Sequence, residues 1–316
     1  MNWHGGWAAV SVGCLLVSAG FSASEASEVE VRPVPQRQTV EVRIGGRLFT
    51  AFRYGPEFTQ KPVFYPILSP DGDMVNRELS FIRENPETTD HPHHQSLFFG
   101  YGNVNGLDFW SSAHGERIVC EGVLRTSGGR TGELDFAADW RDPQGQSVLR
   151  EIRRVRFGAT EDSRWMDHEI TLLALDQSLT FNDTKEGMLG LRLADALREQ
   201  GGSGHYQDAF GREGSARIWG KRAPWVALRG ELAGRPVTVV IFEHPDSTRH
   251  PSYWHARDYG LFAVNPFGRK DFVEGARPLD RRLEPGESLR FRWRILIYRG
   301  RVPKERLDED YSRYIQ

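Results

Sequence analysis

Most of the histidines of this 316-residue chain are gathered in two short segments. Three imidazoles and a carboxylate occupy residues 90–94, and three more imidazoles lie within residues 244–255. Imidazole has an ordinary pKa close to neutral pH, so it can donate a proton, accept a proton or bind a metal. We therefore expect the two segments to form one polar active or binding site.

The first segment contains a proline that restricts its backbone. Pro92 disfavours the α conformation at His91, so the segment is predicted to be extended. In an extended segment His91 and His93 point to one side, whereas Asp90 and His94 point to the other. The expected arrangement therefore places two imidazoles next to each other.

Three chemical roles suit these side chains. Neutral imidazoles could bind a divalent metal, for which the candidates are His91, His93 and His255, with His94 or Glu186 as further choices for a third ligand. A histidine oriented by the nearby carboxylate of residue 90 could act as a general acid or base. The imidazoles could also simply bind substrate hydroxyls.

Aromatic and polar residues surround both segments, and such mixtures are typical of sugar sites. The expected catalytic residues are His91, His93, Glu186 and His255. The residues expected to bind substrate are Lys61, Tyr65, Asp90, His94, Tyr101, Asp108, Trp110, Arg192, His244, His250, Trp254, Arg257, Asp258, Tyr259 and Asn265. An ion pair between Arg192 and Asp195 is the alternative for those two residues.

The composition is that of a folded protein with a mixed surface. Hydrophobic residues make up 39% of the chain, which is enough for a sizeable core. The 41 basic and 43 acidic residues are interspersed and give a net charge of -2. Without a basic stripe, nothing points to nucleic acid as a partner.

The N-terminus has the features of an export signal. Residues 7–19 are almost free of charge and are followed by small residues, with cleavage expected after Ser24 or Ala26. We therefore predict a signal peptide at residues 1–26 and a periplasmic or extracellular protein. The apolar run is shorter than the ~20 residues of a membrane span, so no permanent span is expected. Cys14 would leave with the leader, and Cys120 alone could form no internal disulfide.

The remaining chain has the alternating pattern of β-strands. Residues 27–38 contain two prolines and predict a linker, and residues 39–316 predict a single β-sandwich domain. Alternation is clearest at residues 289–297, and residues 163–175 predict another strand. Helical patterns are scarce, and the best are at residues 191–199 and 303–314. These features predict an all-β fold, a large antiparallel β-sandwich with few short helices.

Several long motifs carry a resemblance to a known family. In order along residues 61–268, they are "KPVFYP", "ETTDHPHHQSLFFGYGNVNGLDFW", "TKEGMLGLRLAD", "KRAPWV" and "HPSYWHARDYGLFAVNPFG". Together they resemble the bacterial family labelled PmoA, or methane oxygenase. The resemblance implies a galactose-mutarotase-like supersandwich and carbohydrate chemistry. The label itself would imply a copper or iron oxygenase, but particulate methane monooxygenase is an integral membrane protein.

The leading hypothesis is an exported carbohydrate-processing enzyme, an epimerase, lyase or hydrolase, that uses a histidine and a carboxylate as acid and base. Its partner would be a small-molecule or oligosaccharide substrate. The first alternative is a non-catalytic carbohydrate-binding module, in which acid and base need not meet at one reacting atom. The second is a metal-dependent (copper or iron) oxygenase, which requires a compact ligand shell of imidazoles alone or of imidazoles with a carboxylate.

Overall fold

The computed structural model describes residues 1–4, 28–55, 60–79 and 87–316. Two eight-stranded sheets form most of this structure, and every pair of neighbouring strands is antiparallel. The all-β prediction is therefore confirmed.

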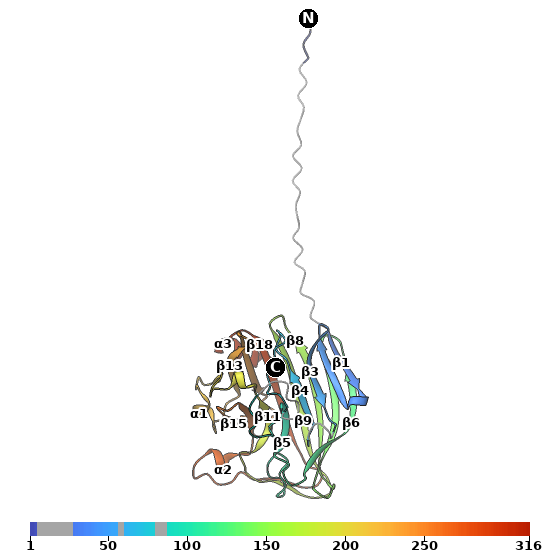
Figure 1. The fold of residues 1–316 in the computed structure, drawn as a ribbon, viewed down its shortest axis with the longest axis vertical. Helices are drawn as coiled ribbons and strands as arrows, with labels where there is room; N and C mark the ends of the chain where they lie inside the picture. Colours follow the sequence, from blue (N-terminus) through green and yellow to red (C-terminus); the bar gives the residue numbers. More distant parts are fainter. Residues whose placement is uncertain (5–27, 56–59, 80–86) are drawn as a thin grey trace.

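The first sheet has the order β1-β2-β3-β4-β5-β11-β16-β15, and the second has the order β12-β13-β14-β18-β9-β8-β7-β6. In Figure 1, α1, α2 and β15 lie on one side of the molecule, opposite β1 and β6. The strands are β1 (Val29–Val34), β2 (Thr39–Ile44), β3 (Arg47–Arg53), β4 (Val63–Ile67), β5 (Leu97–Tyr101), β6 (Arg117–Ser127), β7 (Gly132–Arg141), β8 (Ser147–Ala159), β9 (Ser163–Ala174), β10 (Leu179–Phe181), β11 (Gly187–Arg192), β12 (His205–Asp208), β13 (Trp225–Leu232), β14 (Arg235–Glu243), β15 (Tyr253–Ala256), β16 (Leu261–Asn265), β17 (Arg281–Leu283) and β18 (Ser288–Arg299).

The alternation of apolar and polar residues in the sequence agrees with the burial of side chains in the strands. In β18, Leu289, Phe291 and Trp293 are buried, whereas Arg290 is exposed. Side chains of successive strand residues point to opposite faces, so one face of β18 joins the core. β9 begins at Ser163 as predicted.

The linker predicted at residues 27–38 is wrong. β1 pairs with β2 along its whole length, and Val29 is fully buried and exchanges backbone hydrogen bonds with Gly129. Proline is tolerated here because β1 is the outermost strand of its sheet, where one row of N–H groups has no neighbouring strand. A short 3-10 helix, η1 (Pro35–Arg37), then leads into β2. The ordered sheet thus begins ten residues before the predicted domain.

The helix predicted at residues 191–199 is also wrong. The segment begins at the end of β11 and continues into a 3-10 helix, η2 (Asp195–Leu197). Leu191 of β11 and Leu193, Ala194 and Leu197 beyond it are all buried in the main core, so they give an apolar pattern without an α-helix. The helix predicted at residues 303–314 is confirmed as α3 (Lys304–Tyr314). Within the described ranges, the other two α-helices, α1 (Ser215–Ile218) and α2 (Arg269–Phe272), have a single turn each.

The main core lies between the two large sheets. Phe52 of β3 stacks on Phe136 of β7 with ring centroids 4.3 Å apart, and Phe99 of β5 contacts Trp140 and Trp293 of the opposite sheet. Cys120 packs half-buried against this core, and burial raises the pKa of its thiol to about 11. That thiol is therefore a poor nucleophile at neutral pH.

The outer faces of both sheets carry smaller apolar clusters. On the second sheet, α3 covers Phe242 and Tyr298. On the first sheet, Val63, Phe98 and Ala263 form a floor that is covered by residues of neighbouring loops. No helix in the described part of the chain is long and apolar enough to cross a membrane. The predicted leader falls almost entirely outside the described residues.

Candidate functional site

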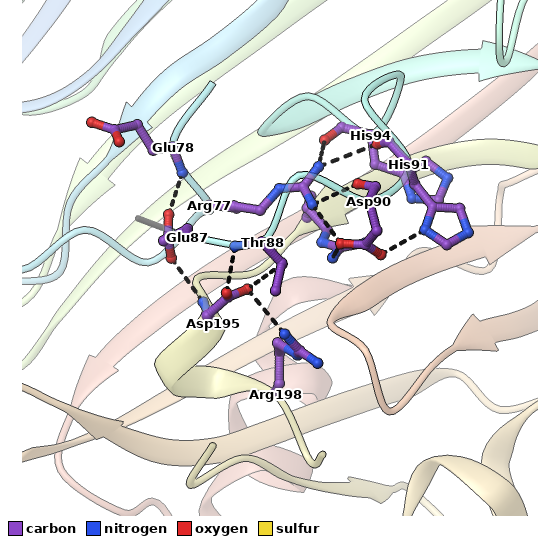
Figure 2. A network of polar contacts seen from close by, with 10 residues as sticks. Arg77, Glu78, Glu87, Thr88, Asp90, His91, His94, Asp195 and Arg198 are labelled. Atoms are coloured by element: carbon purple, nitrogen blue, oxygen red, sulfur yellow. Dashed lines mark hydrogen bonds and ion pairs between the residues drawn. The ribbon is translucent and has the colours of Figure 1, made fainter. Parts of the chain in front are cut away.

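Asp90 is the centre of a charged hydrogen-bond network (Figure 2). Its Oδ2 lies 2.6 Å from Nδ1 of His91, and its Oδ1 accepts hydrogen bonds from Arg77 at 3.0 Å and Arg192 at 2.7 Å. Burial opposes ionisation, but the hydrogen bonds from His91 and Arg192 hold the pKa of Asp90 below its usual value. An ionised carboxylate at this position assigns the proton of His91 to Nδ1, so Nε2 carries the lone pair.

The two arginines that donate hydrogen bonds to this carboxylate are buried. Arg192 is fully buried, and Arg77 is 3% exposed. Arg77 also donates hydrogen bonds to the backbone oxygens of His91 and His94, which fixes the loop. Because a buried guanidinium is stabilised by an opposite charge, Asp90 balances the charge of both arginines as well as orienting His91.

The histidine segment is also tied to η2. The backbone N–H and the hydroxyl of Thr88 both donate to the carboxylate of Asp195, which is 3.5 Å from Arg198 (Figure 2). Glu87 accepts hydrogen bonds from the backbone N–H groups of Asp195 and Glu78. The alternative pairing of Arg192 with Asp195 is therefore wrong, since each has another partner.

The backbone of the segment is a tight turn, so the predicted extended geometry is wrong. His91 has a φ of 46°, in the left-handed region, and its carbonyl accepts a hydrogen bond from the N–H of His94 at 2.9 Å. Pro92 then occupies the second position of a four-residue turn, which its fixed φ favours. Pro92 does keep His91 out of the right-handed α region, but the turn brings His94 beside His91.

The turn and the second segment meet through a stack of parallel rings. The ring of His91 lies 5.0 Å from that of His94 and 4.7 Å from that of Tyr259, with interplanar angles of 2° and 3°. The guanidinium carbons of Arg192 and Arg257 lie 5.1 and 5.4 Å from the Tyr259 centroid. The structure therefore brings residues 90–94 and 255–260 together.

His93 and His94 are held uncharged by their surroundings. Burial, together with the charges of Lys61 and His91, lowers the pKa of His93 to about 4. His94 is 3% exposed, and burial followed by the charge of His93 lowers its pKa further. Lys61 is buried too, which lowers the pKa of its ammonium to about 7, and it donates a hydrogen bond to the carbonyl of Trp110.

His255 is oriented by a backbone group. Its Nδ1 lies 3.1 Å from the carbonyl oxygen of Lys185, so Nδ1 carries the proton and Nε2 is the acceptor. Burial, followed by the charge of Arg257, lowers the pKa of His255 to about 3. The neighbouring Glu186 is half-buried and pairs with the Lys185 ammonium at 2.6 Å.

Sheet register places the two ends of the site on one face. His255 is opposite Ala263, Ala263 is opposite Gly190, and Gly190 is opposite Phe98, whose ring lies 5.8 Å from His94. Directly opposed residues point to the same side of a sheet, and three strand spacings amount to roughly 14 Å. The imidazoles of β15 and of the turn thus border one surface.

A cleft of about 290 Å³ lies beside this surface. Its lining includes Trp219, Arg257 and Asp258, and the Trp219 ring lies 6.5 Å from that of His255. Sequence reasoning missed Trp219, and it also missed Arg77. Neither residue lies in a histidine-rich segment or a periodic strand, so no sequence signal distinguishes them.

Three residues expected to bind substrate are structural. Tyr101 and Trp254 belong to the main core, where the Trp254 indole donates to the carbonyl of Ala223. Asn265 is fully buried, and both ends of its amide bond backbone groups of Thr184 and Phe267. Alternation explains Trp254, because it precedes His255 and therefore faces the opposite side of the sheet.

Two histidines of the second segment contact residues away from the imidazole turn. His244 is 3.1 Å from Arg292 of β18 and contacts the ring of Tyr314 of α3. His250 lies 3.4 Å from the carboxylate of Glu243. The prediction that residues 244–255 act together is therefore wrong, since only His255 faces the imidazole turn.

The loop residues near the turn mainly stabilise the local structure. The carboxylate of Asp108 accepts hydrogen bonds from the backbone of Trp110 and Ser111, as in a capped turn. Trp110 is buried, with its ring 5.6 Å from His94. Tyr65 is 6% exposed on the same outer face, beneath the guanidinium of Arg53.

The imidazoles do not form a metal-binding shell. No group of three or more His, Cys, Asp or Glu side chains in the described ranges is arranged to hold a metal ion. The rings of His91 and His94 are stacked in parallel, and the ring of His93 lies 6.0 Å from that of His91 at an interplanar angle of 70°. Within the described residues, the candidate set His91, His93 and His255 is thus not a group that could hold a metal ion.

Comparisons with solved structures give distant likenesses. The Slr1438 protein from Synechocystis sp. PCC 6803 has 11% identity and a TM-score of 0.35, with 86% of this chain and 96% of that chain covered. A GalM/aldose epimerase homologue from C. elegans has 8% identity and a TM-score of 0.33, covering 87% and 100%. A polysaccharide lyase has 11% identity and a TM-score of 0.38, covering 88% of this chain and 33% of the lyase.

No curated protein sequence matches the chain. The family match is extensive and covers both large sheets, although it begins after β1. Its description assigns no activity and does not carry the PmoA label. On this match over residues 39–312, the chain belongs to the family described as a family of unknown function (DUF6807).

Proposed function

We propose that the protein is an exported sugar-processing enzyme in which His91 is the general base. The observation that carries the proposal is the contact of 2.6 Å between Asp90 and Nδ1 of His91. A carboxylate that holds an imidazole in one tautomer is a recurrent device of acid–base catalysis. The side chain of His91 is 43% exposed, so its Nε2 can be reached by a substrate.

The neighbouring groups suit a neutral, hydroxyl-rich substrate surface. His93 and His255 have lowered pKa values of about 4 and about 3, so at neutral pH both are uncharged and can donate to or accept from hydroxyls. Trp219 offers an aromatic face beside Arg257 and Asp258, which is the combination that sugars bind.

Proton transfer at a sugar carbon, as in epimerisation or β-elimination, suits this arrangement better than hydrolysis by two carboxylates. Hydrolysis by the usual route needs one carboxylic acid that is protonated at working pH. Asp90 is held ionised by His91 and Arg192, and Glu186 is paired with Lys185. In the proposed reaction, Nε2 of His91 accepts the proton from the sugar carbon. The electron pair of that C–H bond then either takes up a proton on the opposite face, as in epimerisation, or forms the double bond and expels the substituent of the neighbouring carbon, as in elimination. Glu186 and His255 bind the far end of the ring.

A panel of aldoses, uronates and oligosaccharides tests the proposal. Proton NMR would detect exchange or epimerisation, and absorbance would detect the unsaturated product of elimination. We expect His91→Asn to abolish turnover, whereas His205→Asn, an exposed histidine of the second sheet, should leave it unchanged. Turnover that survives in the His91 variant would reject His91 as the base. Sugar binding without turnover in the wild type would favour a binding module.

A further inference from the structure

A cluster of arginines lies beyond the imidazoles on the same side of the first sheet. It surrounds a cleft of about 70 Å³ whose lining includes Arg222, Arg249, Tyr253 and Arg269. The charge of Arg281 also acts on Arg249. Tyr253 forms the floor, with the guanidinium carbon of Arg222 5.7 Å from the centre of its ring.

These arginines have no carboxylate partner among the described residues. Arg222 donates to the carbonyl of Pro251 at 2.6 Å, and Arg269 donates to the carbonyls of Arg277 and Pro278. Nε of Arg281 is buried without a hydrogen-bond partner in the described part of the chain. The side chain of Arg249 forms neither a hydrogen bond nor an ion pair with any residue that the structure describes.

The cluster is therefore repulsive as it stands. Burial, and then the charges of Arg269, Arg281 and Arg222, lowers the pKa of Arg249. Arg249 also has a φ of 68°, a left-handed conformation that is unfavourable for arginine. The nearby carboxylate of Asp183 is already used, since it accepts hydrogen bonds from the backbone of Lys270 and Leu279.

We propose that this arginine cluster, Arg222, Arg249, Arg269 and Arg281, is an oxyanion-binding site. Guanidinium groups present paired N–H donors that match the oxygens of sulfate, phosphate or carboxylate. A bound oxyanion would supply the missing opposite charge and accept the donors that Arg249 leaves unused. The cleft volume of about 70 Å³ limits the ligand to a small group.

The position of the arginine cluster connects it to the imidazoles. Tyr253 and His255 are alternate residues of β15, so they share one face and lie about 7 Å apart along the strand. The ring of Phe272 contacts both, at 5.6 and 5.8 Å. The oxyanion is thus either a free ion or an anionic group on a sugar that reaches past Phe272. The binding site itself does not depend on the catalytic proposal.

Inorganic sulfate is the first probe. We expect sodium sulfate to raise the melting temperature of the full chain by at least about 3 °C over sodium chloride of equal ionic strength. Arg249→Asn should abolish this difference, because it removes the charge while asparagine tolerates left-handed backbone. In chloride alone, R249N should melt at or above the temperature of the wild type, since repulsion is relieved.

Controls separate specific binding from general salt effects. Arg301→Asn removes an exposed arginine that pairs with Glu231, and it should keep the full sulfate shift. Arg269→Gln is a second variant whose backbone lies in α2, and it too should lose the shift. Equal sulfate shifts in the wild type, R249N and R269Q, or no shift in the wild type, would overturn the proposal.

The source of the oxyanion is decided by calorimetric titration with sulfate, glucose 6-sulfate and glucose. Binding of glucose 6-sulfate at least tenfold tighter than sulfate, with none by glucose, would assign the site to an anionic sugar. Equal affinity for sulfate and glucose 6-sulfate would assign it to a free ion. Binding of all three that persists in R249N would reject the arginine cluster as the site.

Discussion

Nδ1 of His91 lies 2.6 Å from Oδ2 of Asp90 while the face of the same ring lies 4.7 Å from that of Tyr259. The imidazole is therefore fixed along its edge by a carboxylate and across its plane by an aromatic ring. A ring held in both directions presents Nε2 at one position. This preorganisation is what general-base catalysis requires.

Asp90→Asn tests the role of the carboxylate. An amide does not favour the Nδ1-protonated tautomer, so we expect the proton of His91 to move to Nε2 in a substantial fraction of molecules. Nitrogen-15 NMR of the imidazole would report the tautomer, and turnover should fall roughly 10²- to 10⁴-fold. Asp258→Asn, an exposed carboxylate of the cleft, is the control for the tautomer. A tautomer unchanged in D90N would show that Asp90 does not set it.

Acid should destabilise the protein through its buried imidazoles. The pKa values of His93 and His255, about 4 and about 3, lie below the ordinary 6.5. Between these values the unfolded chain binds more protons than the folded one, so the free energy of unfolding falls as pH drops from 6.5 toward 3. His255, which is 2% exposed, should account for on the order of 4 kcal/mol.

Denaturant unfolding at a series of pH values measures this loss. His255→Asn should flatten the curve below pH 6.5, and the exposed His205→Asn should leave its slope intact. The slopes of unfolding free energy against pH are compared, and not the free energies themselves, because His255→Asn also removes packing contacts. An equally steep curve in both variants would assign acid sensitivity to other groups.

Two lysines should act on two different histidines. After burial, the charge of Lys61 is the second cause of the lowered pKa of His93. The pKa of His255 is lowered by burial, then by the charge of Arg257, with a smaller contribution from the charge of Lys185. Lys61→Met should therefore raise the pKa of His93, and Lys185→Met should raise that of His255. Proton NMR titration of the imidazole signals in both variants measures the two values. If either variant shifted the pKa values of both histidines equally, the assignment of one lysine to each histidine would be contradicted.

Gly190 should be sensitive to a single methyl group. A Cβ at this position would lie 2.7 Å from the Phe98 ring and 3.0 Å from Trp110, the residues that support His94. Gly190→Ala should therefore lower the free energy of unfolding by about 1–3 kcal/mol. Gly122→Ala, in β6 with open space around the glycine, should change it by less than about 1 kcal/mol. If both substitutions had equal effects in thermal or denaturant unfolding, Phe98 and Trp110 would be able to move aside at little cost.

The sequence predicted elements whose burial follows from alternation. β18 could be predicted directly because Leu289, Phe291 and Trp293 are each followed by an arginine. β11 could not, because a strand inside a sheet that is buried on both faces loses alternation and resembles an apolar helix. β1 was missed because Pro33 within it and Pro35 just after it suggest a linker, and only the position of β1 at the sheet edge makes Pro33 acceptable.

The site residues that lie close together in the sequence could be predicted. Those brought to the site only by the fold could not. The histidine density of residues 90–94 pointed to His91 and Asp90. The contact with Tyr259 depends on the turn between β15 and β16, which no local pattern specifies. Arg77 and Trp219 reach the site from segments without any such density, so only the fold identifies them.

β1 has a practical consequence for work with fragments. A recombinant chain cut at the boundary of the family match would begin at residue 39 and would lack β1. It would leave the backbone groups of β2 unpaired along one side, and a bare strand of this kind recruits strands from other molecules. Fragments that begin before Val29 should stay monodisperse, whereas those that begin at Thr39 should self-associate.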